Sequence, residues 1–515
     1  MICSIVRQQN TLAVEGIPMK LVRKLVIAGL TSALCSNVAY AADYYVSPQV
    51  AGAVSGTPLA AISLRGQRIR SNVTTTTRKS ERWKSSPRVT TTTTTEPTTT
   101  VTEEPVVTTS PEPSVAEVDE PVVSTVNDDE ETASPSPTPT PTSSPTPTTS
   151  GSTTYASLAD LVNSGVLVPG DRVFLKGGRH GLLRVNGMNF TAPVTISGAP
   201  GEVAQVEGIE VAYSSNVIIQ DLKVWRSDPS VTTMTMVRGY SNASDITFTN
   251  LDIRAAADSP DYLSWNFAKW DSNKRNGVSI EGPRMSVIGN RVTGVYFGIS
   301  ASGPYALIEN NIIDGFSGDG MRALGDNSII RGNKVQNCFI IDTNHPDGFQ
   351  SWSRNASGQA GAGTLYNLRI ENNKIYEWNH SVSNPLQCGL QGIGMFNGMF
   401  ENVTITNNVI SVSSYHGISV YGAKNLVISQ NTVATKSSSR QGLPWIMVGW
   451  NGFDGKAPVN VMVANNIANS YDVPESSTNN VHAINNTTVT NAATEFVSPT
   501  TNDFTLLPTA KAANT

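Results

Sequence analysis

From about residue 210 onward, the hydrophobic positions of the chain follow a short unit that recurs many times. Each unit has an apolar run of a few residues, one or two Asn, a second short apolar run and a turn that contains Gly. Runs this short, bounded by Asn and Gly, predict strands and turns rather than helices. Seven units place an Asn after the first run: Asn290, Asn311, Asn333, Asn373, Asn408, Asn431 and Asn466.

The spacing of these Asn residues predicts how the strands are arranged. Asn290, Asn311 and Asn333 are 21 and 22 residues apart, which is one coil of a parallel β-helix, and longer steps require loops that leave the coil. Stacked Asn side chains would form a hydrogen-bonded ladder, because buried amides are costly without partners. We therefore predict an all-β domain over residues 154–515, a right-handed parallel β-helix solenoid of the pectin-lyase type. Its last segment, from about Val489, lacks the repeat and is expected to shield the open end.

A second repeat places a variable residue followed by Gly at the start of one strand in each coil. We call these variable residues the starters: Asn276, Phe297, Asp319, Asp347, Gln391, His416 and Gln441. Because side chains alternate along a strand, the second residue after a starter is expected to point inward, and the third and fifth to point outward. The expected inward residues are all apolar: Val278, Ile299, Met321, Phe349, Ile393 and Ile418.

The outward positions of three successive coils predict a row of aromatic side chains spaced by about 4.8 Å. Such a row suits the flat faces of sugar rings, and its members are Trp352, Phe396 and Tyr421. Polar candidates for substrate contacts on the same face are Gln350, Gln391 and Ser419. The alternative is that the loops at residues 353–368 and 374–390 cover the aromatic rings or form the walls of a cleft.

The starters also bring two carboxylates, Asp319 and Asp347, onto adjacent coils about 5 Å apart. Repulsion would make one of them keep its proton and act as an acid, while the other acts as a base or stabilises charge. Four more side chains extend this to a candidate catalytic cluster: Arg322, His345, Tyr415 and His416. The alternative is that Asp-Gly and His-Gly are only turn residues at strand entry.

Two stretches resemble known families. Residues 169–178, 193–196 and 216–222 are similar to the opening of β-helix alginate and chondroitin lyases. This resemblance implies β-elimination or C5 epimerisation of a uronate polysaccharide. Such chemistry neutralises the carboxylate, removes the C5 proton and, in a lyase, protonates the leaving oxygen. Arg322 is the candidate for the first step, His416 or His345 for the second and Tyr415 for the third. Ca²⁺ is the cofactor that the family suggests, but its ligands have no assigned residues here, so any metal site is unknown.

Asp347-Gly348-Phe349 and residues 415–420 resemble the strand entries of polygalacturonases, which are inverting β-helix hydrolases. This resemblance implies hydrolysis by Asp319, Asp347 and a water molecule. The family's Asp-Asp pair and its Arg-Ile-Lys segment are missing from this chain. Residues 319–353, 390–394 and 415–424 also look like secreted bacterial β-helix repeat proteins, which supports the fold and the site's location.

A third function class is a non-catalytic polysaccharide-binding or adhesin-like solenoid. The longer resemblance favours uronate chemistry over hydrolysis and binding.

The N-terminal third is organised differently. Residues 1–41 are identified as a signal peptide region with Met19 as the true start, because a basic segment precedes an apolar run and Ala39-Tyr40-Ala41. Residues 42–70 have no assignment. Residues 71–153 are rich in Thr, Pro, Ser and acids, which predicts a disordered stalk that links the domain to its surroundings, including a cell surface.

Composition narrows the partners and the location. The net charge of -5 and the absence of a basic stripe argue against nucleic acid as a partner, and no apolar run is long enough for a transmembrane segment. We expect a secreted, periplasmic or extracellular protein whose partner is a polysaccharide. Of the four cysteines, Cys3 and Cys35 fall in the signal region. Cys338 and Cys388 would either pair or stay free, and burial habits favour free thiols.

Overall fold

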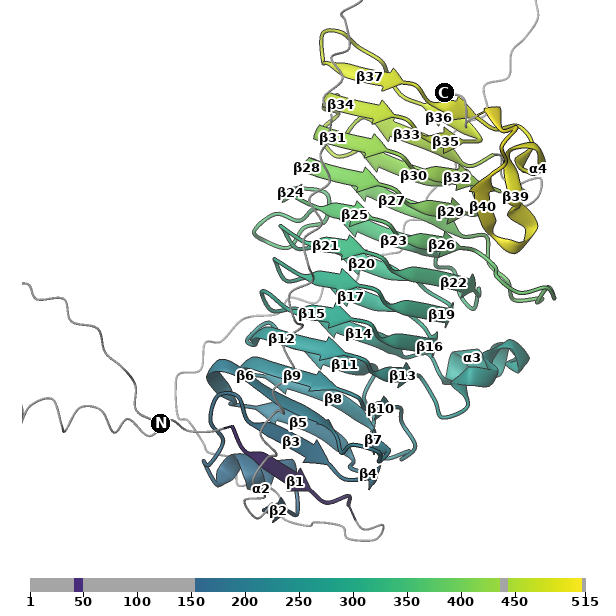
Figure 1. The fold of residues 1–515 in the computed structure, drawn as a ribbon. Coiled ribbons are helices and arrows are strands. Elements are labelled where there is room, and N and C mark those ends of the chain that lie inside the picture. The colour runs from purple at the N-terminus through teal and green to yellow at the C-terminus, as the bar shows by residue number, and fades with distance from the viewer. Residues whose placement is uncertain (1–40, 50–152, 436–442, 512–515) are drawn as a thin grey trace, which may run out of the picture. The chain divides into compact units, whose positions relative to one another are not determined.

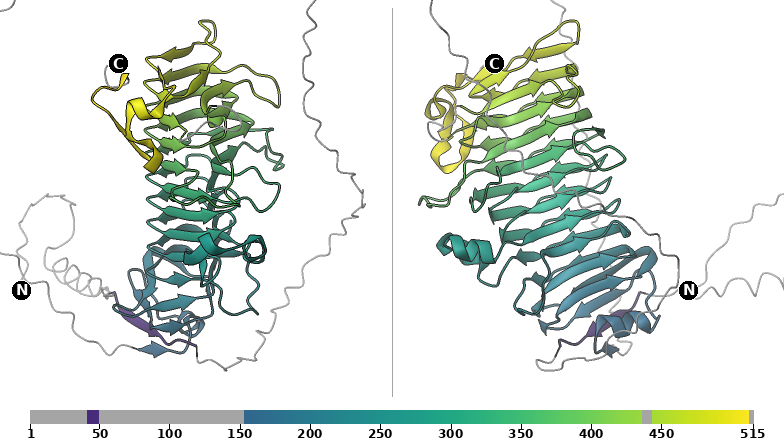
Figure 2. Two further views of the ribbon diagram at one scale, coloured as in Figure 1. Left: turned by 90° about the vertical axis from the view of Figure 1, so that its right-hand side faces the viewer. Right: turned by 180° about the vertical axis from the view of Figure 1, so that it is seen from behind.

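The computed structural model describes residues 41–49, 153–435 and 443–511. They form a right-handed parallel β-helix in which the chain passes repeatedly through three parallel sheets (Figures 1 and 2). The fold predicted from the sequence is therefore confirmed. The predicted signal region, most of the predicted stalk and the starter Gln441 lie outside the described residues. Within the described residues, no helix is long and apolar enough to cross a membrane.

Sheet A has 15 strands, and most of its members precede the Asn turns. Its strands are β1 (Asp43–Val46), β2 (Thr154–Tyr155), β3 (Arg172–Leu175), β6 (Asn189–Gly198), β9 (Ser215–Gln220), β12 (Ser244–Thr249), β15 (Ser286–Ile288), β18 (Leu307–Glu309), β21 (Ile329–Arg331), β24 (Thr364–Tyr366), β25 (Arg369–Glu371), β28 (Met399–Thr406), β31 (Ala423–Ser429), β34 (Val459–Ala464) and β37 (Val481–Ile484).

Sheet B has 12 strands, most of which follow the Asn turns. They are β4 (Gly178–Arg179), β7 (Ala204–Val206), β10 (Lys223–Val224), β13 (Asp252–Arg254), β16 (Arg291–Val295), β19 (Ile312–Phe316), β22 (Lys334–Cys338), β26 (Lys374–Tyr376), β29 (Val409–Ser411), β32 (Thr432–Ala434), β35 (Ile467–Ala468) and β38 (Thr487–Thr488).

Sheet C has 11 strands and contains the strands that the starters introduce. They are β5 (Leu182–Asn186), β8 (Gly208–Ala212), β11 (Thr235–Gly239), β14 (Asn276–Ile280), β17 (Ile299–Ala301), β20 (Met321–Ala323), β23 (Asp347–Trp352), β27 (Gln391–Asn397), β30 (His416–Tyr421), β33 (Trp445–Gly449) and β36 (Ser470–Asp472).

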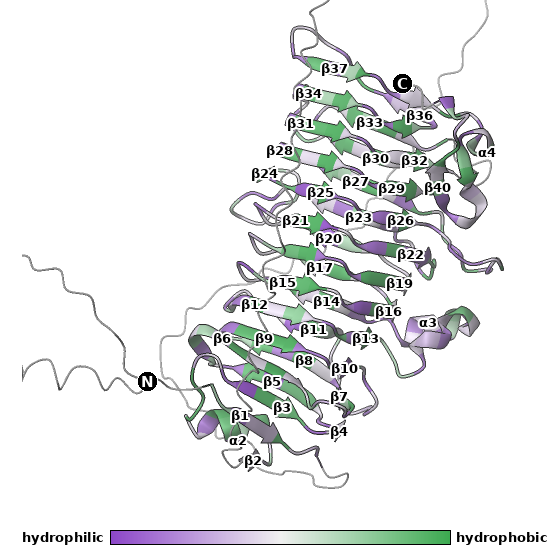
Figure 3. Ribbon diagram, in the orientation of Figure 1, coloured by the Kyte–Doolittle hydropathy of each residue, from purple (hydrophilic) through white to green (hydrophobic). Residues whose placement is uncertain are grey.

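The core is a continuous column of apolar side chains inside the coil. The six residues predicted to point inward from sheet C are all at most 1% exposed. Sheet A adds a stack in which Val287, Ile308 and Ile330 occupy equivalent positions on neighbouring strands. At the first end of the solenoid, helix α2 (Leu158–Asn163) contributes Leu158 and Leu161 to the same core. Figure 3 colours the ribbon by hydropathy and shows hydrophobic segments on strands such as β31, β34 and β37.

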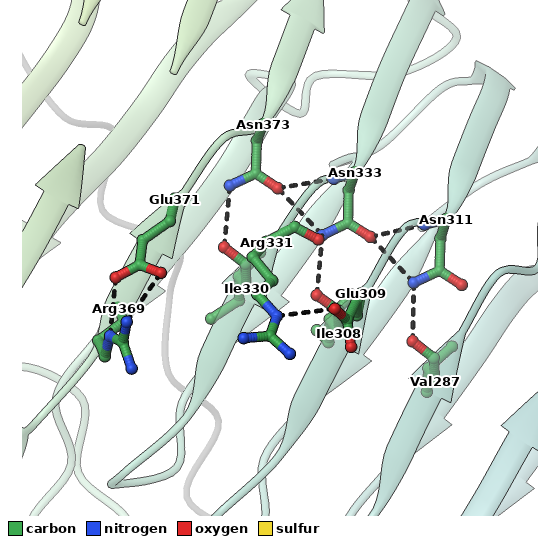
Figure 4. A network of polar contacts seen from close by, with 10 residues as sticks. All are labelled: Val287, Ile308, Glu309, Asn311, Ile330, Arg331, Asn333, Arg369, Glu371 and Asn373. Carbon is green, nitrogen blue, oxygen red and sulfur yellow. Dashed lines mark hydrogen bonds and ion pairs between the residues drawn. The ribbon is translucent and has the colours of Figure 1, made fainter. Parts of the chain in front are cut away.

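A ladder of buried Asn side chains runs along the turn between sheets A and B, as the sequence predicts. Asn373 Oδ1 accepts hydrogen bonds from the backbone N–H of Asn333 at 3.0 Å and from Asn333 Nδ2 at 3.0 Å. Asn373 Nδ2 donates to Ile330 O and to Asn408 Oδ1. Figure 4 shows the same pattern repeated at Asn333 and Asn311. Each amide is therefore fully used by the coils on either side of it.

A second Asn ladder, which sequence analysis missed, lies on the solvent side at the start of the sheet A strands. Asn367 Nδ2 donates to Asn327 Oδ1 at 2.8 Å, and Asn402 donates to Asn367 at 3.0 Å. The ladder continues through Asn425, Asn460 and Asn480. All six residues have φ between 53° and 61°, a left-handed conformation that Asn tolerates better than most residues.

Strand β1 begins the solenoid, although it is separated in sequence from the rest of sheet A. It pairs in parallel with β3, and Arg172 makes an ion pair with Asp43 at 2.8 Å. Residues 43–46, which the sequence left unassigned, therefore belong to the β-helix.

The C-terminal segment differs from the expectation. Strands β39 (Phe496–Ser498) and β40 (Asp503–Leu506) form an antiparallel pair next to helices α4 (Ala492–Glu495) and η2 (Pro499–Thr501). Phe496 packs against Ala434 of β32 and Val489, and Asn502 Nδ2 donates to Asn379 Oδ1. The segment thus lies along the side of sheet B, not across the open end (Figure 1), because its apolar residues pack against that side.

The two cysteines in the described residues form a disulfide. Cys338 and Cys388 are joined with their Cα atoms 5.5 Å apart. This corrects the expectation of free thiols. The physical reason is that a coil brings the end of β22 next to a residue 50 positions later in the chain. A disulfide is consistent with an oxidising compartment, as expected for a secreted protein.

Replacing one ladder Asn tests what holds the coils in register. Asn373→Ala should lower the free energy of unfolding by about 3 kcal/mol, because it leaves several buried backbone and amide groups without partners. Urea denaturation followed by circular dichroism measures this loss. Asn367→Ala in the exposed ladder is the control, with an expected loss of about 1 kcal/mol. Equal losses for the two variants would contradict the structural role of the buried ladder.

Candidate functional site

The candidate site lies on the outer face of sheet C, on strands β20, β23, β27 and β30. The starters stack there in register: Gly320 N donates to Asp347 O at 2.8 Å, and Asp347 pairs directly with Gln391. Among the described residues, the Gly after each starter faces the core without room for a side chain, since a Cβ on Gly348 would lie 2.3 Å from Ile375 Cγ2. Close packing, not a positive φ, therefore requires Gly at this position.

A cavity of about 410 Å³ opens on this face. Six residues that the sequence selected line it: His345, Gln350, Trp352, Gln391, Phe396 and His416. Three lining residues were missed: Ser351, Ala360 and Asn397. The other six selected residues are not part of the lining: Asp319, Arg322, Asp347, Tyr415, Ser419 and Tyr421. The loop at residues 353–368 contributes Ala360 to the wall, whereas residues 374–390 contribute none of the lining.

Asp347 lies directly behind the cavity and is fully buried. Its Oδ2 accepts a hydrogen bond from Gln350 Nε2 at 2.9 Å and lies 3.2 Å from His345 Nδ1. Its Oδ1 has no hydrogen-bond partner among the described residues. Burial is the main cause that raises the pKa of Asp347 to about 7, and the nearby Asp319 adds to this effect.

His345 projects from the segment before β23 into the cavity, and 63% of its side chain is exposed. The hydrogen bond to Asp347 is the main cause that raises the pKa of His345 above its ordinary value. The two groups are linked, because His345 holds a proton more strongly once Asp347 is ionised. The pair is therefore a carboxylate–imidazole dyad in which only the imidazole reaches the cavity.

Asp319 is held in a different way from Asp347. It is 1% exposed, and its Oδ2 accepts a hydrogen bond from Arg322 Nε at 2.5 Å. Its Oδ1 accepts from the backbone N–H of Asp347 at 3.1 Å. The Arg322 guanidinium also packs over the Phe297 ring at 3.7 Å. Asp319 and Arg322 therefore neutralise each other beside the cavity, and the Arg322 side chain, which is 19% exposed, does not line it.

His416 differs from His345 in its burial and in the direction of its pKa shift. It is buried, and burial lowers the pKa of His416 to about 4, so the ring is neutral at pH 7. Ser419 Oγ accepts a hydrogen bond from Trp445 Nε1 at 3.0 Å and lies 2.8 Å from His416 Nδ1. The Ser419 hydroxyl hydrogen is thus available to Nδ1, which favours the tautomer with the ring proton on Nε2.

Two predicted site residues, Ser419 and Tyr415, therefore contact the His416 ring instead of lining the cavity. Ser419 is buried behind the ring, and Tyr415 packs on it with a centroid distance of 4.1 Å. Trp445, which the sequence did not single out, pairs with His416 in the sheet. The one feature of the sequence that could have indicated its role is its position at the start of the apolar run 445–449.

The predicted aromatic row is interrupted. A β-bulge between Ser351 and Trp352 shifts the register, so that Trp352 lies opposite Asn397 instead of Phe396. Phe396 and Tyr421 remain neighbours, with ring centroids 5.9 Å apart. Trp352 instead contacts the guanidinium groups of Arg322 and Arg354. A bulge adds one residue to a strand, which a count of alternating positions does not anticipate.

Within residues 41–49, 153–435 and 443–511, no three His, Cys, Asp or Glu side chains gather in a way that could hold a metal ion. The structure therefore assigns no residues to the Ca²⁺ that the family resemblance suggests.

Comparisons with known proteins concern the fold. No family model matches the sequence, and no curated protein matches it. The Dettilon tailspike protein is 13% identical with a TM-score of 0.40, and the match covers 61% of this chain and 57% of the tailspike, little more than half its length. A mannuronic acid-specific polysaccharide family 6 lyase from human gut microbiota is 17% identical, with a TM-score of 0.36 and coverages of 64% and 79%. The module of an Azotobacter vinelandii mannuronan C-5 epimerase is 13% identical, with a TM-score of 0.33 and coverages of 65% and 94%. With its three stacked parallel sheets, the chain has a right-handed parallel β-helix fold.

Proposed function

We propose that the protein is a secreted enzyme that acts on an extracellular, uronate-containing polysaccharide by β-elimination or C5 epimerisation. The observation that carries this proposal is the cavity on sheet C, which is lined by an exposed His345 and a neutral His416. Asp347, buried behind the wall, is hydrogen-bonded to His345. Both reactions begin by removing the proton at C5 of a uronate, and this arrangement supplies a base and hydrogen-bond donors for that step.

His345 is the proposed base. Asp347 Oδ2 accepts a hydrogen bond from Nδ1–H of the neutral ring, so the Nε2 lone pair is free to take the C5 proton. Asp347 then stabilises the imidazolium that forms. In an elimination the His345 imidazolium passes this proton to the leaving oxygen. In an epimerisation a second donor, on the opposite face of C5, supplies the new proton.

His416 and Gln391 are the proposed partners of the uronate carboxylate. Removal of the C5 proton moves negative charge onto that carboxylate, and fixed hydrogen-bond donors stabilise it there. His416 offers Nε2–H in its favoured tautomer, and Gln391 offers its amide. These two residues replace Arg322, because they line the cavity and Arg322 does not.

Hydrolysis by the Asp319 and Asp347 pair has less support. An inverting hydrolase needs both carboxyl groups to face the scissile bond and a water molecule. Neither carboxyl lines the cavity, and Asp319 is neutralised by Arg322. A purely binding surface also has less support, because it has no need of a fully buried carboxyl group linked to an exposed imidazole, which costs stability.

A panel of polyuronates and neutral glycans distinguishes these functions. New ultraviolet absorbance would identify a lyase, and solvent deuterium incorporated at C5 without absorbance would identify an epimerase. New reducing ends without absorbance would favour the hydrolase, and retention without any product would favour the binder.

Substitution of the dyad tests the assigned roles. His345→Ala should lower kcat on the active polyuronate by about 100-fold or more, because it removes the general base. Asp347→Asn should lower it as well, since the ring loses its anionic partner. The control is His482→Ala, which changes a His on β37 that hydrogen-bonds Asn480 and should leave kcat unchanged. Full activity in His345→Ala, with its melting temperature unchanged, would exclude the dyad.

The pH dependence follows from the raised pKa of His345. A base must be neutral, so kcat/KM should rise with pH through a pKa above 6.5, the ordinary value for His. In Asp347→Asn the anion is gone, so the pKa of His345 should fall toward that value. Nuclear magnetic resonance titration of labelled His rings measures this shift directly, even if the variant is inactive. An unchanged His345 pKa in the variant would contradict the proposed coupling.

A further inference from the structure

A second cavity, of about 300 Å³, opens on sheet B, on strands that carry none of the site residues described above. Its floor is formed by outward side chains of β13, β16 and β19, which are hydrogen-bonded neighbours. The 3₁₀ helix η1 (Ser259–Ser264) and His380 form its walls. This volume is at the lower end of the range for small-ligand sites. The charged and hydroxyl groups that line it are Asp252, Arg254, Tyr262, Arg291, Thr293 and Asp314.

The carboxylates in this cavity are already occupied. Asp252 accepts hydrogen bonds from Lys223 Nζ at 3.0 Å and from Arg254 Nε and Nη2 at 2.9 and 2.5 Å. Asp314 accepts from the Tyr262 hydroxyl at 2.6 Å, from Asn337 Nδ2 at 2.8 Å and from Arg291 Nη2 at 2.9 Å. An incoming ligand would therefore find few acceptors with spare capacity.

The groups that remain unused are donors. Among the described residues, the Arg291 guanidinium has Asp314 as its one hydrogen-bond partner, and 53% of its side chain is exposed. Thr293 is one of the lining residues and is 2% exposed, and its buried hydroxyl has no hydrogen-bond partner among the described residues. A buried hydroxyl without a partner costs free energy unless a ligand satisfies it. A guanidinium and a hydroxyl side by side suit a ligand with anionic oxygen atoms.

A row of positive charge leads away from this cavity along the solenoid axis. Arg291, Ile312, Lys334 and Lys374 occupy equivalent outward positions on β16, β19, β22 and β26. Neighbouring strands are about 4.8 Å apart, so the three cations span about 14 Å. In the part of the chain that the structure describes, neither Lys334 nor Lys374 makes a salt bridge, and Lys334 Nζ lies 5.7 Å from the centre of the Tyr376 ring. Such a row complements a polymer that carries repeated negative charges.

We propose that this cavity and the basic row form a second, non-catalytic carbohydrate-binding site for an anionic polysaccharide. One carboxylate of the polymer binds Arg291 and Thr293, and the following sugar residues run along Lys334 and Lys374. The substrate class rests on the proposed function, but the site itself lies on a different sheet, sheet B instead of sheet C. Its role is to hold the polymer while other segments enter the cavity on sheet C.

Binding of a hexa-uronide to the His345→Ala variant, which keeps the ligand intact, tests the proposal. Isothermal titration calorimetry should give two hexamers per chain. Arg291→Gln combined with Lys374→Gln should weaken one of the two sites by about 10-fold or more, because charged hydrogen bonds and ion pairs are lost. Thr293→Val, which keeps the side-chain shape, should weaken the same site by a few-fold. Arg331→Gln is the matched control, since Arg331 is an outward arginine on sheet A that pairs with Glu309.

Kinetics with His345 intact give a second measurement. The Arg291→Gln and Lys374→Gln double variant should raise KM for the polymer several-fold, with kcat and the activity on a trimer unchanged. A stoichiometry of one, or two sites that the sheet B variants leave unaltered, would overturn the second site while the proposed function stands. The same conclusion follows if Arg331→Gln weakens binding equally, or if single-stranded DNA binds the row as tightly as the uronide. If no uronide is bound or processed at all, the proposed function fails first.

Discussion

The hydrogen bonding between one coil and the next is the constraint on which the rest of the structure depends. Each ladder Asn accepts from the backbone and side chain of one coil and donates to its neighbours, as Asn333 does between Asn311 and Asn373. The amides are buried, so a coil out of register would leave several of them without partners. The chain can therefore leave the coil in a loop, but it must rejoin the coil in the register that the Asn ladder sets. The step from Asn333 to Asn373 does this, and the loop that it contains includes His345.

The same register fixes the geometry of the site on sheet C. Asp347 and Gln391 are adjacent because β23 and β27 are paired in register. Gly394, on the neighbouring strand, makes room beside Asp347, because a Cβ there would lie 2.6 Å from Asp347 Oδ1 and 2.3 Å from Phe396 Cε2. The absence of a side chain at position 394 thus allows the Phe396 ring and the carboxylate to share one space. Residues that never contact a ligand determine where the titratable groups lie.

The sequence was informative wherever a periodic rule applied. The Asn turns, the inward residues and the stacked starters all follow from a repeat of one coil and from alternation along strands, and those within the described residues have their predicted places. Prediction was less successful where tertiary packing decides. Alternation could not show that Asp319 would be neutralised by Arg322, or that Asp347 would be buried behind His345. The bulge at Trp352 breaks the period itself. The Cys338–Cys388 disulfide depends on how an irregular loop folds back. The row of cations on sheet B was missed for a similar reason: its members are far apart in sequence, so folding creates a short basic row where the sequence has none.

Burial of Asp347 is the strongest physical indication that this face has a chemical role. A carboxyl group that is fully buried, with one oxygen unpartnered within the described structure, destabilises the fold, and a neutral side chain of the same shape would avoid that cost. The arrangement gives one benefit that a neutral side chain lacks: it changes the proton affinity of an exposed imidazole. Asp319, equally buried, has an arginine partner and lies outside the cavity lining, so its charge is explained by structure alone. The contrast between two carboxylates on adjacent coils therefore separates a structural acid from one whose position supports the proposed proton transfer at His345.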